Sequence, residues 1–559
     1  MPRRPLAHML SASTTDFPAT AAPAPRVERA ARETPWYQPS ARQFYTTLIV
    51  VSLVVGALSL LIPSTPSYDP WAWLVWGREI IHVNLQTTGG PTWKPLPVVF
   101  TTIFALFGKA QPDLWLVIAR AGAFASVVML FRLSYGLTRQ IAGATIKAGA
   151  GVARMAAFGP ALLAGLIAVI ALTFSPGFIS NNALGYSEGL ATAVILIAAE
   201  RHLDGRPRQA FAIGFLAALD RPEIWLFWGP YGLWLFWRDP GARWLVGSLF
   251  VAIPILWFGP EYWGSGHFLR GVSRAQHVRS NSLALAKCPF CSELKDAAWP
   301  TVLLRIKVAA AGLVVVVAFV LGRRYRGAGW RGILAAPQVR AQAVAALAGV
   351  TGLVWFVLIA VLTQAGFSGN NRYLVIGSAL IDICGAVAWG WAALELGRAG
   401  GRLLHRGREP AAGGLYGAAV WTSVAMFGAL FALLPPWVGN DVGLVQRTHR
   451  ALVYQAHLRD GASQLVARYG GAAKVLRCGT VMTEGFQVPM VAWTLGVHTL
   501  RVEGPAPSGA PLGPAPNVIL QTRASRNLAL LPVVHSWPGV HYTYAGSSGP
   551  FRLFTHCSG

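Results

Sequence analysis

Long runs of apolar residues, separated by short polar loops, make up most of the chain before residue 435. The first run, Phe44 to Ile62, carries no charge and has the roughly 20 residues that a helix needs to cross a bilayer. Further apolar segments that predict helices are 113–137, 156–173, 186–203, 209–220, 223–237, 244–259, 300–321, 341–363, 373–396 and 413–434. The pattern predicts a polytopic α-helical membrane protein with about eleven transmembrane helices. The short pair 209–220 and 223–237 could also form one bent hairpin that does not fully cross.

Charged residues are sparse, at 12% of 559, and the formal net charge is +25. A soluble chain carries about 25% charged residues, so the composition favours lipid as the main solvent. The basic residues gather in alternate loops, such as 323–331 and 398–408, which the positive-inside rule places in the cytoplasm. This predicts a plasma-membrane protein with its N-terminus inside and its C-terminus outside. The same rule explains the basic excess without nucleic acid as a partner, and part of it can meet membrane lipid or a phosphate substrate.

The two ends of the chain differ from its apolar middle. Residues 1–43 are rich in Ala, Pro, Ser, Thr and Arg, and we expect a disordered cytoplasmic leader. Residues 44–434 form the predicted transmembrane domain. In residues 435–559, turn-forming residues such as those after Gly504 surround short β-like runs at 518–520 and 551–554. An amphipathic helix at 443–469 completes the prediction of a small extracytoplasmic α/β domain.

The five cysteines suggest two disulfides in an oxidising compartment. Cys478 and Cys557 flank most of the tail domain, and we expect both at strand ends, close enough to bond. Free thiols or a shuffled pairing are the alternatives. Cys288 and Cys291 form a Cys-Pro-Phe-Cys motif, for which a structural disulfide is favoured over redox catalysis or metal binding. Cys384 lies in an apolar run and is expected to be inert.

The first external loop carries the main candidate for chemistry, Asp69. It follows directly on the first span, and Trp71, Trp73 and Trp76 after it indicate an interfacial helix. A carboxylate at the mouth of a helix bundle, beside aromatic residues, can act as a general base on a sugar hydroxyl. The alternative is that Asp69 only caps the helix that follows. A Lys-Pro-Leu-Pro segment from Lys94 then precedes an apolar run too short to span.

Ionisable residues recur at other helix ends on the same side of the membrane. Glu188 begins an apolar helix, where it is either functional or placed for the helix dipole. Arg221 lies between Asp220 and Glu223 at a Pro-broken tip, and either binds a phosphate or belongs to a local ion-pair cluster.

The loop 260–299 and a late span supply further basic candidates. Arg270 and Arg274 lie four residues apart, on one face if helical, and either bind an anion or are solvated. Arg372 precedes a span, where it meets a lipid phosphate or snorkels. Our predicted topology places all these candidates outside.

In this order of motifs the chain resembles the GT-C superfamily of integral membrane glycosyltransferases over roughly residues 44–400. The resemblance rests on the first-loop acid, Lys-Pro-Leu-Pro, Ala119-Arg120 in the next span, the Arg-Pro-Glu hairpin and a late Asn-Arg-Tyr. It implies Asp69 as the catalytic carboxylate and a polyprenyl-phosphate-linked sugar as donor, and some members bind a divalent metal such as Mg or Mn. Many members pair two acids, whereas here Pro70 follows Asp69, so Glu188 or Glu223 becomes the candidate second acid and metal dependence is in question. The Arg-rich, Lys-poor composition is typical of actinobacteria.

The resulting hypothesis is an inverting sugar transfer to an extracytoplasmic cell-envelope glycan, lipid or protein. Asp69 would deprotonate the acceptor, and basic residues would hold the departing phosphate. The expected donor-binding residues are Lys94, Arg221, Glu223, Arg270 or Arg274, and Arg372. One rival is a flippase for lipid-linked glycans, which would favour charges deep in several spans and repeat symmetry. Another is a non-enzymatic envelope-assembly protein.

Overall fold

The computed structural model describes residues 40–145, 150–278, 282–298, 301–404, 412–431, 435–505, 511, 513–522 and 534–557. The chain divides into two compact units, Met1–Thr47 and Leu48–Gly559, and apart from the start of the first helix everything below concerns the second. Of the leader expected at 1–43, residues 1–39 lie outside the described residues, and the first helix already begins at Ala41. The basic loop at 405–411 and most of the turn-rich stretch after Gly504 also lie outside them.

A helix forms at each apolar segment that the sequence predicted. They are α1 (Ala41–Leu58) with η1 (Ser59–Leu61), α4 (Gln111–Thr145), α5 (Ala150–Thr173), α7 (Glu188–Leu203), α8 (Pro207–Asp220), α9 (Trp225–Arg238), α10 (Arg243–Ser265), α13 (Thr301–Ala335), α14 (Pro337–Gln364), α15 (Val375–Leu404) and α16 (Ala412–Phe431). Among the described residues, six segments are long and apolar enough to cross a membrane: Ala41–Leu61, Gly108–Gly143, Pro240–Ser265, Leu304–Arg323, Pro337–Gln364 and Asn371–Leu403. The helices α7, α8 and α9 have only 14 to 16 residues, short of the roughly 20 needed for a full crossing.

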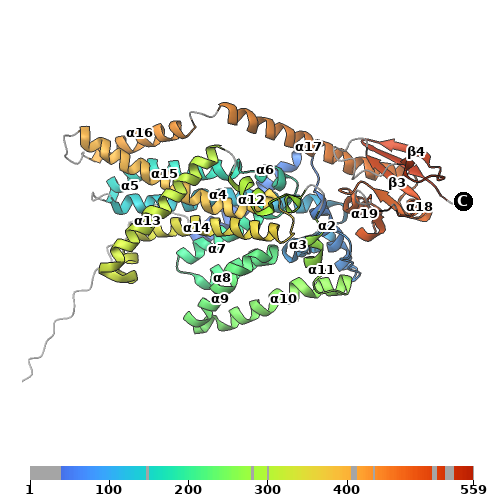
Figure 1. Ribbon diagram of the computed structural model, residues 1–559, viewed down its shortest axis with the longest axis horizontal. Helices are drawn as coiled ribbons and strands as arrows, with labels where there is room; N and C mark the ends of the chain where they lie inside the picture. The colour runs from blue at the N-terminus through green and yellow to red at the C-terminus, as the bar shows by residue number, and fades with distance from the viewer. Residues whose placement is uncertain are drawn as a thin grey trace, which may run out of the picture. The chain divides into compact units, whose positions relative to one another are not determined.

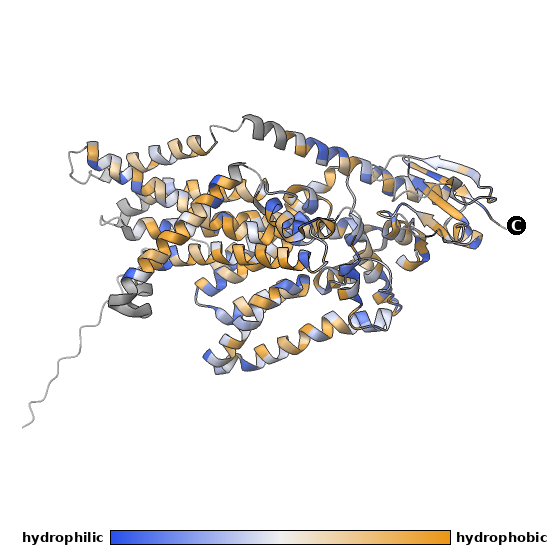
Figure 2. Ribbon diagram, viewed as in Figure 1, coloured by the Kyte–Doolittle hydropathy of each residue, from blue (hydrophilic) through white to orange (hydrophobic). Residues whose placement is uncertain are grey.

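Helix α15 is the centre of the bundle and packs against α4, α5, α13, α14 and α16 (Figure 1). Small residues allow these close approaches. A Cβ on Gly385 would lie 2.3 Å from the carbonyl oxygen of Ile306, and one on Gly390 would lie 2.7 Å from that of Pro160. The outer helices α10 and α13 instead expose large apolar side chains, among them Val251, Ile255 and Val315, as expected for lipid-facing surface (Figure 2).

The first loop folds into α2 (Tyr68–Ile81) and α3 (Pro95–Ala105), which pack on each other. The expected short helix after Lys94 is therefore confirmed. Exposure of the tryptophans to lipid headgroups, from which an interfacial helix was predicted, is not observed, because Trp71, Trp73 and Trp76 are all buried in protein contacts. Their aromatic area stabilises the packing of α2 rather than contact with lipid headgroups.

The tail begins with α17 (Pro435–Arg468), followed by α18 (Ala472–Cys478) and α19 (Val488–Leu495). Its five strands are β1 (Val481–Thr483), β2 (Val502–Glu503), β3 (Val518–Thr522), β4 (Thr543–Ser548) and β5 (Phe551–Thr555), in the order β2-β1-β3-β5-β4. The strand β1 is parallel to β2 and β3, and the β3-β5-β4 half is antiparallel. Helix α17 packs on β4 and β5, which buries the apolar face of that half.

Both predicted disulfides are present. Cys478 bonds to Cys557 with a Cα–Cα distance of 4.8 Å, and Cys288 bonds to Cys291 at 5.3 Å. Cys557 follows β5 as expected, but Cys478 ends the helix α18 rather than a strand. The segment before it is rich in Ala, Lys, Leu and Arg, which are good helix formers, so local propensity favours the helix. Cys384 is free and buried.

Candidate active site

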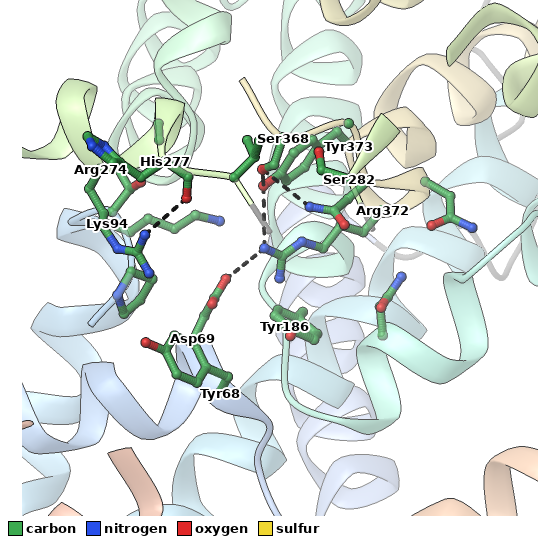
Figure 3. A pocket seen from close by; sticks show the side chains of 18 of the residues that line it. Tyr68, Asp69, Lys94, Tyr186, Arg274, His277, Ser282, Ser368, Arg372 and Tyr373 are labelled. Carbon is green, nitrogen blue, oxygen red and sulfur yellow. Dashed lines mark hydrogen bonds and ion pairs between the residues drawn. The ribbon is translucent and has the colours of Figure 1, made fainter. Parts of the chain in front are cut away.

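An ion pair between the first loop and a late helix start forms one side of the site. Asp69 lies in the first turn of α2, and Arg372 lies in η6 (Asn371–Leu374), 303 positions later. Arg372 donates from Nη2 to Asp69 Oδ2 over 2.7 Å (Figure 3). Within the described residues the Asp69 carboxylate accepts no backbone N–H, so it does not serve as a helix cap.

A second carboxylate, that of Glu188 at the start of α7, lies within 4 Å of three basic side chains. Its side chain is only 1% exposed. Its Oε1 accepts from Arg221 Nη2 and lies 3.8 Å from both Lys94 Nζ and Arg372 Nε. Because three cations converge on this oxygen, Glu188 positions them, and it is poorly suited to accept a proton.

Acids on the α8–α9 hairpin complete the cluster. Asp220 ends α8 and is fully buried, and its Oδ1 lies 4.0 Å from Lys94 Nζ. Lys94 also donates to Ser187 Oγ over 3.2 Å. Glu223, in η3 (Pro222–Ile224), lies 3.5 Å from Arg221 Nη1. The break at Pro222 thus brings three charged side chains back into the bundle instead of leaving them on an exposed tip.

Two tyrosine rings hold the guanidinium groups in place. The centre of the Arg372 guanidinium lies 4.0 Å from the Tyr186 ring centroid, and that of Arg221 lies 4.4 Å from the Tyr373 ring centroid. Such cation–π contacts strengthen when water is excluded. Sequence reasoning assigned no role on the substrate to these tyrosines or to Asp220, although each lies within two positions of a charged residue that it did select.

Several buried guanidinium donors in the site remain available. In the part of the chain that the structure describes, Arg372 Nε and Nη1 and Arg221 Nε have no hydrogen-bond partner. A buried N–H group without a partner is costly, about 1–3 kcal/mol each. A phosphate oxygen is the acceptor that such planar donors bind best.

Two cavities meet at this cluster. The first has a volume of about 320 Å³ and a polar wall that includes Tyr68, Asp69, Tyr186, Arg274, Asn370 and Arg372. The second has a volume of about 490 Å³ and a largely apolar wall that includes Trp225, Leu226, Trp257, Leu358, Ile359 and Leu362. Residues of both walls are Thr92, Lys94, Ala275, Ser368 and Tyr373. The cavities therefore adjoin where the basic residues lie.

The two predicted residues Arg270 and Arg274 make different contacts. Both lie on α11 (Arg270–Gln276). Arg270 donates to the carbonyl oxygens of Thr88, Gly90 and Pro91 and lies 3.7 Å from Glu261, so it anchors the first loop. It lines neither cavity. Arg274 donates to Gly90 and yet lines the polar cavity, where Figure 3 shows it opposite Arg372.

The residues at the cluster do not fit a divalent metal. Across the described ranges, no group of three or more His, Cys, Asp or Glu side chains is placed to hold an ion. Between the two most buried acids, Glu188 and Asp220, stands the Lys94 ammonium, where a second positive charge would be repelled. The thiols of Cys288 and Cys291 are joined in a disulfide and offer no thiolate ligand.

No protein-family model matches the chain. No curated protein matches it either. One solved structure with a similar chain is that of ArnT from Cupriavidus metallidurans in the apo state. The match covers 92% of this chain and 98% of that chain, with 14% identity and a TM-score of 0.44. At this level of similarity the chemistry of the site has to be argued from its own geometry.

Proposed function

We propose that this chain is an integral membrane glycosyltransferase of the GT-C type. In this proposal it moves a sugar from a polyprenyl-phosphate donor to a hydroxyl group of a cell-envelope acceptor. One observation carries the proposal: a polar cavity with a carboxylate adjoins an apolar cavity at a cluster of basic side chains. A lipid-linked sugar phosphate has three matching parts: a sugar for the polar cavity, a phosphate for the basic side chains and a lipid chain for the apolar cavity.

The donor fits with its lipid chain in the apolar cavity and its phosphate at the junction. Lys94 lines both cavities there, and Arg372 has unpartnered donors in the same place. The sugar then extends into the polar cavity toward Asp69. Apolar walls with a few placed polar groups are the usual design of a small-molecule site.

The reaction follows from this placement. Asp69 takes the proton from the acceptor hydroxyl, and that oxygen attacks the anomeric carbon from the side opposite the phosphate. The bond from the anomeric carbon to the phosphate oxygen breaks, and its electron pair leaves with the polyprenyl phosphate. The extra negative charge on the leaving phosphate is stabilised by Lys94 and Arg372. The bond from Arg372 uses Oδ2 of Asp69, so Oδ1 is the oxygen that receives the proton.

The test is Asp69→Asn in membranes supplied with a labelled lipid-linked sugar. Asn keeps the size of the side chain and removes the base, so transfer should fall by about 10²–10⁴-fold at unchanged abundance. The matched control is Asp113→Asn, because Asp113 is also paired with an arginine, Arg459, but lies outside both cavities. Transfer at the wild-type rate by Asp69→Asn would refute the proposed role.

The flippase alternative is less well supported. Two charged residues inside the predicted spans are committed to fixed contacts: Arg120 holds the carbonyl oxygens of Ser59 and Ala183, and Arg132 pairs with Glu200 at 2.5 Å. A flippase would depend on a buried charge such as Asp382 in α15 and tolerate the loss of Asp69. We expect the reverse, with transfer retained in Asp382→Asn and lost in Asp69→Asn.

A further inference from the structure

The tail is fixed to the first loop by contacts with α2. Arg78 donates to the carbonyl oxygens of Trp493 and Val497 over 3.0 and 2.7 Å. The next residue, Glu79, is buried and lies 2.8 Å from His498 Nδ1. These contacts place the C-terminal end of α19 directly against the helix that carries Asp69.

Aromatic packing fixes the same junction from a second direction. The rings of Trp71 and Trp493 have centroids 5.3 Å apart, and Trp493 Nε1 donates to Gln111 Oε1 over 2.8 Å. Helix α19 is thus held by both α2 and α4. Such a junction, with buried polar pairs and two indole rings in contact at an interplanar angle of 53°, keeps the tail in one orientation over the first cavity.

This orientation brings Phe486, in the loop between β1 and α19, to the wall of the polar cavity. Its side chain is 39% exposed. Tyr68, next to the catalytic candidate Asp69, presents its ring to Phe486 with centroids 6.5 Å apart and an interplanar angle of 88°. Elsewhere this wall carries polar side chains, among them Asn181, Asn370 and Ser282.

We propose that Phe486 and Tyr68 form the subsite for the acceptor, and that the acceptor presents a neutral sugar ring there. This inference rests on the proposed function and names the acceptor class. A sugar ring has an apolar C–H face and a rim of hydroxyl groups. One of the two perpendicular aromatic rings stacks against that face, and the amide and hydroxyl side chains of the same cavity hydrogen-bond to the rim. The subsite lies beside Asp69, which receives the proton of the attacking hydroxyl.

The tail, and not the helical bundle alone, thereby selects the acceptor. The donor phosphate belongs at Lys94 and Arg372, whereas Phe486 lines only the polar cavity and not the apolar one. Changing Phe486 should therefore alter the use of the acceptor and leave the donor unaffected. In kinetic terms, the KM for the acceptor rises while the KM for the donor is unchanged.

The experiment measures binding of methyl α-D-mannopyranoside, methyl β-D-galactopyranoside and methyl α-D-arabinofuranoside to the purified full chain in detergent, by saturation-transfer NMR. Phe486→Ala should weaken the bound glycoside by about tenfold, as for the loss of one aromatic contact. Phe486→Trp should restore binding. The matched control is Tyr544→Ala, which removes an exposed aromatic ring of the tail that does not line the cavity.

Each outcome decides the inference. Wild-type binding by Phe486→Ala, or no glycoside bound by the wild-type protein, overturns it. An equal loss in Tyr544→Ala also overturns it, since the effect would then be on tail folding. If glycosides bind through Phe486 but the wild-type protein transfers no sugar, the proposed function fails and the carbohydrate subsite stands.

Discussion

Replacing Glu188 with Gln tests whether this residue organises the basic cluster or acts as a second catalytic acid. The substitution keeps the size of the side chain and removes one negative charge from a position that is 1% exposed. Arg221, which is equally buried, then keeps only the 3.5 Å contact with Glu223 as a direct acidic partner. Lys94 and Arg372 also lose the carboxylate oxygen that lies 3.8 Å from each.

The expected cost follows from this burial. Removing one partner of a buried ion pair typically lowers the free energy of unfolding by about 3–5 kcal/mol, because the other charge is left uncompensated. The double variant Glu188→Gln with Arg221→Gln removes both partners. Its loss in free energy of unfolding should be smaller than the sum of the losses in the two single variants. For residues in direct contact, the coupling free energy is on the order of 1–3 kcal/mol.

Unfolding of the purified protein in mixed detergent micelles, followed by tryptophan fluorescence, measures these differences. The matched control is Glu395→Gln, which removes a carboxylate from an ion pair with Arg398 that is 40% exposed on the acidic side. An exposed pair contributes about 0–1 kcal/mol, so this variant should unfold nearly as the wild type does. The organising role is wrong if Glu188→Gln unfolds like the control. It is also wrong if Glu188→Gln lowers the free energy of unfolding by the same amount in the wild-type protein and in the Arg221→Gln variant.

Three further predictions concern other parts of the chain. Burial raises the pKa of Glu293 to about 7, above its ordinary 4.5, so the folded protein holds a proton that the unfolded chain releases. The contribution of Glu293 to stability is then fully present below about pH 4.5 and is lost as the pH rises through about 7. Thermal unfolding of Glu293→Gln across this range should therefore show a flatter dependence on pH than that of the wild type. Replacing Cys478 and Cys557 together by Ser should destabilise the tail by up to about 4–5 kcal/mol, and reductant should lower the melting temperature of this variant less than that of the wild type. A reporter fused after the tail should read outside the cytoplasm, and a cytoplasmic signal would contradict our topology.

The helices were predictable because one property, apolar run length, decides them locally. The strands β3 and β5 were predictable for a similar reason, since short runs of large apolar residues between turns mark them. Cys478 shows the limit of such reasoning. Its partner was predicted correctly from its place in the tail, but its own element was wrong because helix propensity exceeded the weak strand pattern.

The site was predictable residue by residue, but not as an arrangement. Asp69 and Arg372 were both selected, yet only the fold shows that they pair across 303 positions. Glu188 was selected as a candidate second acid, and only the fold shows that Lys94, Arg221 and Arg372 surround it. One of Arg270 and Arg274 was expected to bind phosphate, and their spacing could not decide which, since spacing along a helix gives a shared face and not a partner. Arg274 lines the polar cavity and Arg270 does not. The partners of Arg270 are backbone carbonyl oxygens, which no sequence pattern reveals.

The contact of Phe486 with the cavity wall bears on when during synthesis the protein becomes competent. Domains generally fold as they emerge, at roughly 5–20 residues per second, so the tail follows the last helix of the bundle by roughly 6–25 seconds. During that interval Asp69 and Arg372 can already be paired, but the cavity lacks one wall. In a nascent chain in the membrane, the basic cluster would thus form before the site could bind an acceptor. Formation of the Cys478–Cys557 disulfide would then mark the point at which the tail has folded and the cavity is complete.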